Sequence, residues 1–476
     1  MKLRVEKLVA GGLGLARHNG EILLLPGTLP GEEVLAEPGE LVRGVRRARV
    51  VEIMAASPVR VEPDCHLAGR CGGCDFLHVR PAEALRLKSE AALGELAHQA
   101  GIEIELIQSP LAAHYRGRAT VHLDRRDDGV FGVGFYDHRR RLVEFDNCLL
   151  LAPELNGLMA PLRQWAAGLP AAADSAEISL LKGEADSGLA VHFSPRPSLG
   201  QAGRGRRPQG SVLAPALLKV LGDLPPLLAA RGGPKVAVYA RSGERGRPRK
   251  ISPGGPQRLP VAVWPELGLT LCAAPGGFTQ VNPAVNILMV KKILESAAPL
   301  AAGTKMWKQF GPSSAEPDEP NHNCGGVKPL RGTASALDLY SGLGNIALPL
   351  LKSGFAVTAV EESPDGAAAA RENGRGLAGL TVIAERSETA AAQLARQGRR
   401  FSLVVLDPPR SGAKDLAPSV AALEPEMIIY VACHPAVLGR DLPAFASLGY
   451  GLRSLTTLDM FPRTSHLEAL AVLERF

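Results

Sequence analysis

The sequence predicts a multidomain protein with an N-terminal β-barrel, a small central α+β region and a C-terminal parallel α/β domain. Its 476 residues exceed what one hydrophobic core organises, since a domain usually holds about 100 to 200 residues. Short alternating strands come first, a cysteine-rich loop follows, and strands alternate with helices from residue 276 onward. We therefore expect domains at 1–56, 57–275 and 276–476, with an irregular insertion at 301–333.

The first domain has the pattern of a small β-barrel. Apolar and polar residues alternate within short runs, which is the period of a strand with one buried face. Glycine-rich and Pro-Gly turns separate these runs, because such residues adopt the backbone angles of tight turns. The expected strands are 2–8, 21–25, 33–36 and 41–53, broken by Gly-Gly-Leu-Gly at 11–14 and by Pro-Gly pairs that begin at 26, 30 and 38.

The central domain begins with a cysteine-rich loop and a helix. Leu85, Ala92 and Leu96 recur on one face of a helix that we predict at 82–100, and strand-like runs fill 117–150. This mixture indicates a small α+β unit.

Positive charge is concentrated within the central domain. The whole chain has a net charge of +6 and a pI of about 9.0, and residues 195–260 alone hold 13 Lys and Arg against two acidic residues. That stretch is also rich in Gly and Pro, with one helix expected at 214–221 that Gly222 ends. Such a run indicates either a solvated loop or contact with nucleic-acid phosphates, and charge alone does not separate the two.

The composition also excludes a membrane protein. Hydrophobic residues make up 46% of the chain and charged residues 21%, and no apolar run reaches the roughly 18 residues that a membrane span requires. The N-terminus shows neither the apolar core of a secretory signal nor an Arg-rich presequence. We expect a soluble, cytoplasmic monomer.

The C-terminal domain alternates strands and helices as a parallel α/β sheet does. Its expected strands are 334–339, 356–361, 403–406 and 427–432. Its expected helices are 283–298, 346–353 and 366–375.

Clustered cysteines predict a metal centre in the central domain. Cys65-x5-Cys71-x2-Cys74 forms one cluster, and Cys148 far downstream supplies a fourth thiol. In a cytosolic chain four such thiols favour metal binding over disulfides, and both zinc and an iron-sulfur cluster accept four thiolates. Cys272 and Cys324 lie outside this pattern.

A glycine-rich turn follows the first strand of the C-terminal domain. The strand at 336–339 runs into a Gly-x-Gly turn at Gly342 and Gly344, where the missing side chains let a ligand approach the backbone. The next strand ends at Glu361, whose carboxylate is placed to accept hydrogen bonds from the ribose of a nucleoside cofactor. Ala347 stands at the third position of a dinucleotide fingerprint, which also tolerates Ala, so the turn alone does not exclude NAD.

Three further side chains are candidates for the chemistry. Asp407 ends an apolar strand and is followed by two prolines, which hold the loop rigid at the ligand-binding edge of the sheet. Cys433 ends the next strand; a free cysteine is more often a small buried hydrophobe than a nucleophile, but this position favours the nucleophile. Glu468 lies beside an apolar strand, where a raised pKa would suit proton abstraction, although a surface charge would look the same in sequence.

Nearly the whole chain resembles the bacterial RNA uracil-C5-methyltransferases, in the branch that has a TRAM domain and an iron-sulfur cluster and includes 23S ribosomal RNA enzymes. The N-terminal resemblance rests on Val5-x2-Leu8-x2-Gly11-Gly12-x-Gly14-x2-Arg17 and on Leu29-Pro30-Gly31-Glu32. The C-terminal resemblance rests on Phe278-x-Gln280-x-Asn282, the Asp338 to Asn345 loop, Asp407-Pro-Pro-Arg-x-Gly412, Cys433-x-Pro435 and Phe461-Pro-x-Thr-x-His-x-Glu468.

The resemblance implies a fold, two cofactors and a set of site residues. It implies an OB-like TRAM barrel that binds RNA, a small iron-sulfur domain and a Rossmann-like methyltransferase domain. It favours a 4Fe-4S cluster over zinc at the four cysteines, and S-adenosylmethionine as methyl donor, bound near Gln280, Tyr340, Gly342, Asn345, Glu361 and Asp407. It makes Cys433 the nucleophile that attacks carbon 6 of uracil, Glu468 the base that removes the carbon-5 proton, and Asp407 a residue that contacts uracil or positions Cys433.

The sequence departs from the family pattern in a few places, and other functions remain open. His434 stands where Asn is usual and Ser341 replaces a frequent Cys, and neither change removes a catalytic group. We expect RNA as partner, with ribosomal RNA favoured over transfer RNA. An RNA-binding protein that has lost catalysis is the second hypothesis. A radical methylthiotransferase is a third, but it would need a Cys-x3-Cys-x2-Cys triplet that the chain lacks.

Overall fold

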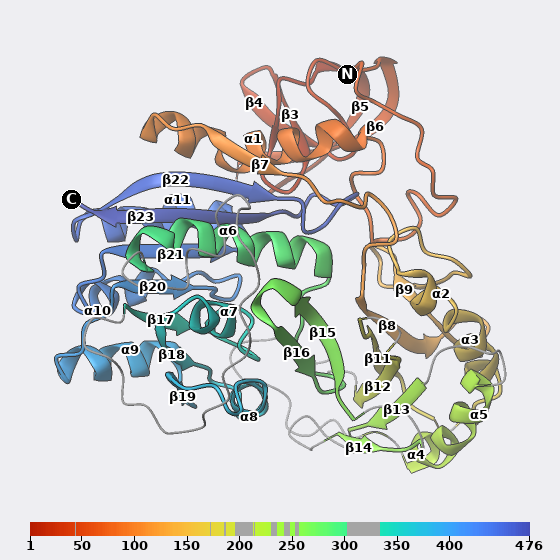
Figure 1. Cartoon of the computed structure of the whole chain (residues 1–476). Coiled ribbons are helices and arrows are strands. Elements are labelled where there is room, and N and C mark those ends of the chain that lie inside the picture. Colours follow the sequence, from red (N-terminus) through yellow and green to blue (C-terminus); the bar gives the residue numbers. More distant parts are fainter. Residues whose placement is uncertain are drawn as a thin grey trace.

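The computed structural model contains four β-sheets of six, seven, two and eight strands. Figure 1 places the N-terminal sheet at the top, the central sheet at the right and the largest sheet at the left. The structure describes residues 1–301 and 334–476 apart from 43, 172, 185–186, 196–212, 214, 230–235, 242–247 and 253–256. Apart from Ala301, which ends α6, the predicted insertion 301–333 falls outside the described residues, and so does about half of the basic stretch 195–260. No described helix is long and apolar enough to cross a membrane.

The N-terminal sheet curls into a half-barrel in the order β1-β5-β6-β4-β3-β2. Its strands are β1 (Lys2–Arg4), β2 (Lys7–Val9), β3 (Leu13–His18), β4 (Glu21–Leu25), β5 (Glu33–Val42) and β6 (Val45–Ala55). The expected strand at 21–25 is confirmed, whereas the expected strand 2–8 is divided into β1 and β2, and β3 was not predicted. The break predicted at the Pro-Gly pair of 38 is wrong, because β5 continues through it, and the predicted break at 11–14 is too long. Gly11 and Gly12 make the turn with positive φ, and Gly14 already lies in β3, where a Cβ would collide with Thr28.

The central sheet has the order β10-β9-β8-β11-β12-β13-β14. Its strands are β8 (Arg118–Arg125), β9 (Phe131–Tyr136), β10 (Leu142–Glu144), β11 (Ala176–Lys182), β12 (Leu189–Pro195), β13 (Val236–Ala240) and β14 (Arg249–Lys250). The helices α2 (Pro153–Asn156), α3 (Met159–Ala167), α4 (Pro215–Val220) and α5 (Leu224–Ala229) belong to this part. The predicted helix at 214–221 is wrong at its end, because Gly222 lies in a 3₁₀ turn at Leu221–Asp223 that leads into α5.

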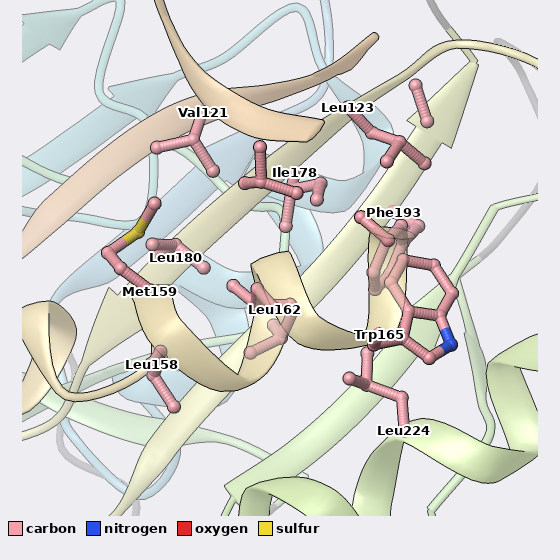
Figure 2. Packing of buried hydrophobic residues seen from close by; sticks show 14 of the residues in the cluster. Val121, Leu123, Leu158, Met159, Leu162, Trp165, Ile178, Leu180, Phe193 and Leu224 are labelled. Carbon is pink, nitrogen blue, oxygen red and sulfur yellow. The ribbon is translucent and has the colours of Figure 1, made fainter. Parts of the chain in front are cut away.

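One face of the central sheet packs on α3, as Figure 2 shows. Val121 and Ile178 from the sheet face Leu162, and Trp165 packs edge-on against Phe193 with ring centroids 5.4 Å apart. The alternating burial of β8 and β11 presents these apolar residues to the helix, as expected for a sheet with one covered face.

The largest sheet has the order β19-β18-β17-β20-β21-β23-β22-β7. Its parallel strands are β17 (Ser335–Leu339), β18 (Ala356–Val360), β19 (Leu380–Ile383), β20 (Leu403–Leu406) and β21 (Met427–Ala432). β23 (Glu468–Arg475) runs antiparallel between β21 and β22 (Tyr450–Leu458). The four predicted strands of this domain are confirmed within a residue or two.

Helices cover both faces of this sheet. The apolar cores on its two faces contain residues of α6 (Pro283–Ala301) and α7 (Ala347–Lys352) on one side, and of α9 (Ser387–Arg396), α10 (Ala417–Ala421) and α11 (Ala436–Ala446) on the other. α8 (Pro364–Asn373) follows β18, and the two-stranded sheet β15 (Leu259–Trp264) and β16 (Leu269–Ala273) packs beside α6. Helix α6 extends three residues beyond its predicted end at 298.

Residues from early in the chain complete the largest sheet. β7 (Ile104–Ile107) pairs in parallel with β22. Leu93 and Ala97 of α1 (Pro81–Ala100) join the apolar core that the largest sheet forms with α9, α10 and α11. The helix itself was predicted, but this placement was not, because a strand's pairing partner some 350 residues away leaves no local sequence signal. The domain limits at 56 and 275 stay a proposal.

Candidate active site and cysteine cavity

Four predicted site residues follow the ends of neighbouring strands. Tyr340 follows β17, Glu361 follows β18, Asp407 follows β20 and Cys433 follows β21. Because these strands are parallel, their carboxyl ends meet at one edge of the sheet, where ligands bind in open α/β sheets. The sheet therefore gathers at one edge residues that lie almost one hundred positions apart in sequence.

Glu468 reaches the same edge from the opposite direction. β23 is antiparallel to β21, with Ala432 paired to Ala469, so the same register carried one residue further sets Glu468 opposite Cys433. Glu468 is only 2% exposed. The antiparallel strand thus delivers a buried carboxyl group to the thiol.

Burial dominates the electrostatics of this edge. It raises the pKa of Cys433 to about 11; Glu468 and Asp407 add to the rise and Arg410 opposes it. Burial also raises the pKa of Asp407 to about 7, and it raises the pKa of Glu468 well above the ordinary range, with Asp407 contributing. Because the site is desolvated and the charges would repel one another, ionisation of one of these two carboxyls and the thiol disfavours ionisation of the others. A proton can therefore move among the three groups.

The glycine-rich turn forms a cradle with open space on one side. Tyr340, Gly342 and Gly344 all have positive φ, and a Cβ added at Gly342 would meet no atom within 4 Å. The Gly342 amide donates to one oxygen of Glu361 at 2.9 Å, and the Ser363 amide donates to the other at 2.7 Å. These residues fit a nucleoside ligand, because a backbone that faces open space and a carboxylate at a strand end are what its ribose needs.

Two predicted cofactor residues are engaged with partners that sequence reasoning missed. The Tyr340 hydroxyl donates to Glu388 at 2.9 Å, and burial raises its pKa. The Asn345 and Asn286 side-chain amides exchange two hydrogen bonds of 2.8 Å, which tie the turn to α6. The local sequence around Asn286 and Glu388 carries no signal for these contacts.

Gln280 lies on a separate loop that precedes α6. The Gly117 amide donates to the Val281 carbonyl at 2.9 Å, and Arg118 donates to the Thr279 carbonyl at 3.2 Å, so both neighbours of Gln280 are held by the start of β8. Within the described residues, no recorded hydrogen bond joins Gln280 to Cys433, Asp407 or Glu361. The structure thus fixes the loop on both sides of Gln280.

The loop after Asp407 is held by α11. The Ala413 amide and the Tyr430 hydroxyl both donate to Oδ2 of Asp441 at 2.8 Å. Gly412 has φ of 78°, and a Cβ there would lie 2.3 Å from Asp441. The glycine of this motif is therefore required by close packing, and Asp441 is a supporting residue that the sequence did not predict.

The four clustered cysteines line one cavity of about 310 Å³. Cys65, Cys71 and Cys74 come from the loop before α1, and Cys148 comes from the loop before α2. All four are free thiols, and burial raises the pKa of Cys74 to about 12, with Cys148 adding to the rise.

The donor set fits a thiolate-bound group. The thiols surround the cavity without meeting at a point, and no three His, Cys, Asp or Glu side chains among the described residues are arranged around a single ion. Apolar side chains and Arg116 complete the wall, and a cation there compensates the charge of thiolates. Cys272 lies on β16, away from this cavity, and Cys324 is outside the described residues.

Comparisons with known proteins agree with this geometry. Residues 330–476 match the family described as tRNA (Uracil-5-)-methyltransferase. The 23S rRNA (uracil(1939)-C(5))-methyltransferase RlmD of Alkalilimnicola ehrlichii is 31% identical over 100% of this chain and 96% of its own. The protein of the same name from Pseudomonas putida is 30% identical over 99% of this chain and 93% of its own.

A solved structure shares the overall fold. It is the Pyrococcus abyssi tRNA (uracil-54, C5)-methyltransferase in complex with S-adenosyl-L-homocysteine, which matches with a TM-score of 0.65 and 21% identity over 99% of this chain and 100% of that one. The full-length match to the bacterial relatives decides the identity. The chain belongs to the family of S-adenosylmethionine-dependent RNA uracil-C5-methyltransferases.

Proposed function

We propose that the protein methylates carbon 5 of one uridine in 23S ribosomal RNA, with Cys433 as nucleophile and Glu468 as base. The observation that carries this proposal is the pairing of β21 with β23, which sets the buried carboxyl of Glu468 opposite the thiol of Cys433. Asp407 lies at the same edge and affects the pKa of both groups.

The reaction proceeds through a covalent adduct. Carbon 5 of uracil is a weak nucleophile, so the Cys433 thiolate first adds to carbon 6 and makes the ring an enolate. S-adenosylmethionine would supply an electrophilic methyl group. Carbon 5 bonds to this methyl group as the methyl–sulfonium bond breaks, and the electron pair of that bond stays on the sulfur of S-adenosylhomocysteine, which leaves. Glu468 then accepts the carbon-5 proton, the sulfur–carbon-6 bond breaks, and its electron pair returns to Cys433. The methylated uracil leaves as an aromatic ring.

We assign binding of the methyl donor to the glycine-rich cradle. Gly342 exposes its backbone to the methyl donor, and Glu361 accepts hydrogen bonds from the ribose hydroxyls of that donor. Each carboxylate oxygen can do so because it keeps a free lone pair after its hydrogen bond from a backbone amide. Tyr340, Asn345, Gln280 and Asp407 complete the proposed site.

We propose ribosomal RNA over transfer RNA as the substrate. The bacterial relatives that match along the whole chain are named for 23S rRNA, whereas the family model named for transfer RNA matches only 330–476. The N-terminal half-barrel is proposed to be an OB-like TRAM domain that binds this RNA. The target base must leave any helical stack to reach Cys433, which favours a loop uridine. We propose that the protein acts as a cytoplasmic monomer.

The cysteine cavity is proposed to hold a 4Fe-4S cluster. Four cysteine ligands, an apolar wall and a compensating arginine support this assignment over a single zinc ion, which would draw its thiolates to within about 2.3 Å of one point. Purified anaerobically, the protein should contain about four iron and four sulfide, and Cys148→Ser should lose them. Stoichiometric zinc without sulfide would refute the assignment.

A trapping experiment tests the proposed chemistry. RNA with 5-fluorouridine at the target position should form a stable adduct with the enzyme, because fluorine at carbon 5 cannot leave as a proton. Cys433→Ala should form no adduct and still bind the methyl donor, and Cys272→Ala is the matched control that should form it normally. Turnover by Cys433→Ala would refute the mechanism, and an inert wild type would favour a protein that only binds RNA.

A comparison of cellular RNA tests the substrate. We expect 5-methyluridine to disappear from one position of 23S rRNA in cells that lack the gene and to remain in transfer RNA. Loss from transfer RNA alone would support the alternative substrate.

A further inference from the structure

The loop 459–467 joins β22 to β23 and leads directly into Glu468. Arg463 within it has φ of 67°, which a residue with a side chain adopts only when its surroundings hold it there. The position of Glu468 therefore depends on what holds this loop.

The cysteine-rich segment 64–76 holds the loop at two points. Asp75 accepts hydrogen bonds from the amide and the hydroxyl of Ser465 at 2.6 and 2.5 Å. Asp64 forms a two-bond ion pair with the Arg463 guanidinium, with both distances 3.0 Å. The Phe76 amide also donates to the Arg463 carbonyl at 3.1 Å.

Both carboxylates are neighbours of cavity cysteines in sequence. Asp64 directly precedes Cys65, and Asp75 directly follows Cys74. A group bound by these cysteines would fix the backbone on which the two carboxylates stand. The Gly72 amide also donates to the Tyr136 carbonyl at 3.0 Å, and Leu67 and Phe76 are buried, so a bound group would add to these restraints on the segment.

Other contacts hold the loop from elements that bear no cluster cysteine. Lys88 of α1 pairs with Asp459 at 2.6 Å and donates to the His466 carbonyl at 3.0 Å. The Tyr115 hydroxyl donates to the Pro462 carbonyl at 3.0 Å. Arg463 also donates to the Ala112 carbonyl at 3.3 Å. Asp64 and Asp75 therefore share the hold on the middle of the loop with Tyr115 and Ala112, and Asp75 alone contacts Ser465 among these four.

We propose that Asp64 and Asp75 are positioning residues that transmit the folded state of the cysteine-rich segment to the loop 459–467, and so place the Glu468 carboxyl against carbon 5. This inference rests on the proposed role of Glu468 as base. It gives the cysteine centre a function in catalysis without any electron transfer.

The contacts of Asp64 and Asp75 with Arg463 and Ser465 form a clamp on the loop 459–467, and breaking this clamp should slow one step of the reaction. Addition of Cys433 to carbon 6 does not need Glu468, so the adduct should form at the wild-type rate. Transfer of the carbon-5 proton to Glu468, with return of the sulfur–carbon electron pair to Cys433, should slow at least about tenfold, because Asp75 accepts two charge-assisted hydrogen bonds and the loss of one alone is worth about that factor. The methylated adduct should therefore accumulate.

The variant Asp75→Ala tests this with ordinary RNA. We expect unchanged iron and sulfide content, faster backbone hydrogen exchange in 459–467, a normal rate of adduct formation and a decay at least about tenfold slower. Asp75→Asn, which keeps an acceptor for Ser465, should restore much of the decay rate. The matched control is Glu474→Ala, which removes an exposed carboxylate from the far end of β23 and should change none of these.

Two outcomes overturn the inference. Decay at the wild-type rate in Asp75→Ala shows that the clamp does not position Glu468, and equal slowing of adduct formation shows that its effect is general misfolding. The proposed function is tested separately by Glu468→Gln, in which the clamp is intact. If that variant turns over without accumulating an adduct, Glu468 is not the base, and the proposed function fails along with the inference.

Discussion

The reactivity of Cys433 toward an alkylating reagent should report the burial of its thiol directly. Burial, Glu468 and Asp407 together raise the pKa of this thiol to about 11 from an ordinary value of 9.0. Only the thiolate reacts with iodoacetamide, and at pH 8 its fraction is about 0.1%, against about 10% for the unshifted thiol. The rate should therefore rise tenfold per pH unit from pH 7 to 10, without a plateau.

The alkylation rates of the buried and the unshifted thiol should differ by less than their thiolate fractions do. A thiolate of higher pKa is a better nucleophile, which returns roughly a factor of ten over two pKa units. Alkylation of Cys433 in the folded protein should thus be about tenfold slower at pH 8 than alkylation of the same peptide in urea. Mass spectrometry of the peptide that contains Cys433 measures both rates and separates this cysteine from the other six.

Two variants fix the sign of the electrostatic effect. Glu468→Gln removes the largest charge contribution to the raised pKa of Cys433, so the pH profile of the alkylation rate should move to lower pH. Arg410→Ala removes a charge that lowers this pKa, so the pH profile of that variant should move to higher pH. A plateau below pH 9 in the wild type would refute the reasoning, because it would mean that the free site stabilises the thiolate.

Three further predictions concern the supports of the site and of the half-barrel. Lys88→Met leaves the buried carboxylate of Asp459 without its cation and should cost about 3 to 5 kcal/mol in urea unfolding; a loss under 1 kcal/mol would contradict a buried pair. Asp441→Ala removes the acceptor that holds the loop after Asp407 and should lower kcat at least about tenfold. Asp441→Asn keeps an oxygen that can accept these hydrogen bonds and should therefore retain more of the wild-type kcat. Burial alone would raise the pKa of Glu32, but hydrogen bonds from Arg60 and two backbone amides lower it below 4.5. The stability that the Glu32 carboxylate gives should therefore be fully present above pH 4.5 and be lost as the pH falls through the lowered pKa. The free energies of unfolding of the wild type and of Glu32→Gln should accordingly become equal in acid.

Much of the active edge could be predicted because parallel strands make it a local property. Once strands at 335–339, 356–360, 403–406 and 427–432 are recognised, the residues that follow them must lie at one edge, whatever the helices between them do. Spacing likewise grouped Cys65, Cys71 and Cys74, three of the four cysteines that line one cavity, whereas Cys148 lies far downstream in the sequence. The turn at 11–14 was predicted too long because glycine serves both a turn and, at Gly14, close packing inside a strand.

The sequence by itself thus determined the fold class, the strand-end residues and the cluster of Cys65, Cys71 and Cys74, because each depends on periodicity or spacing within a short stretch. Only the tertiary structure decided which residues support them. The pairing of β21 with β23 set Glu468 opposite Cys433, and Asp75 came to bond Ser465 across 390 positions of the chain. Such contacts arise from how whole elements pack, and a single side chain in an exposed loop carries no mark of its distant partner.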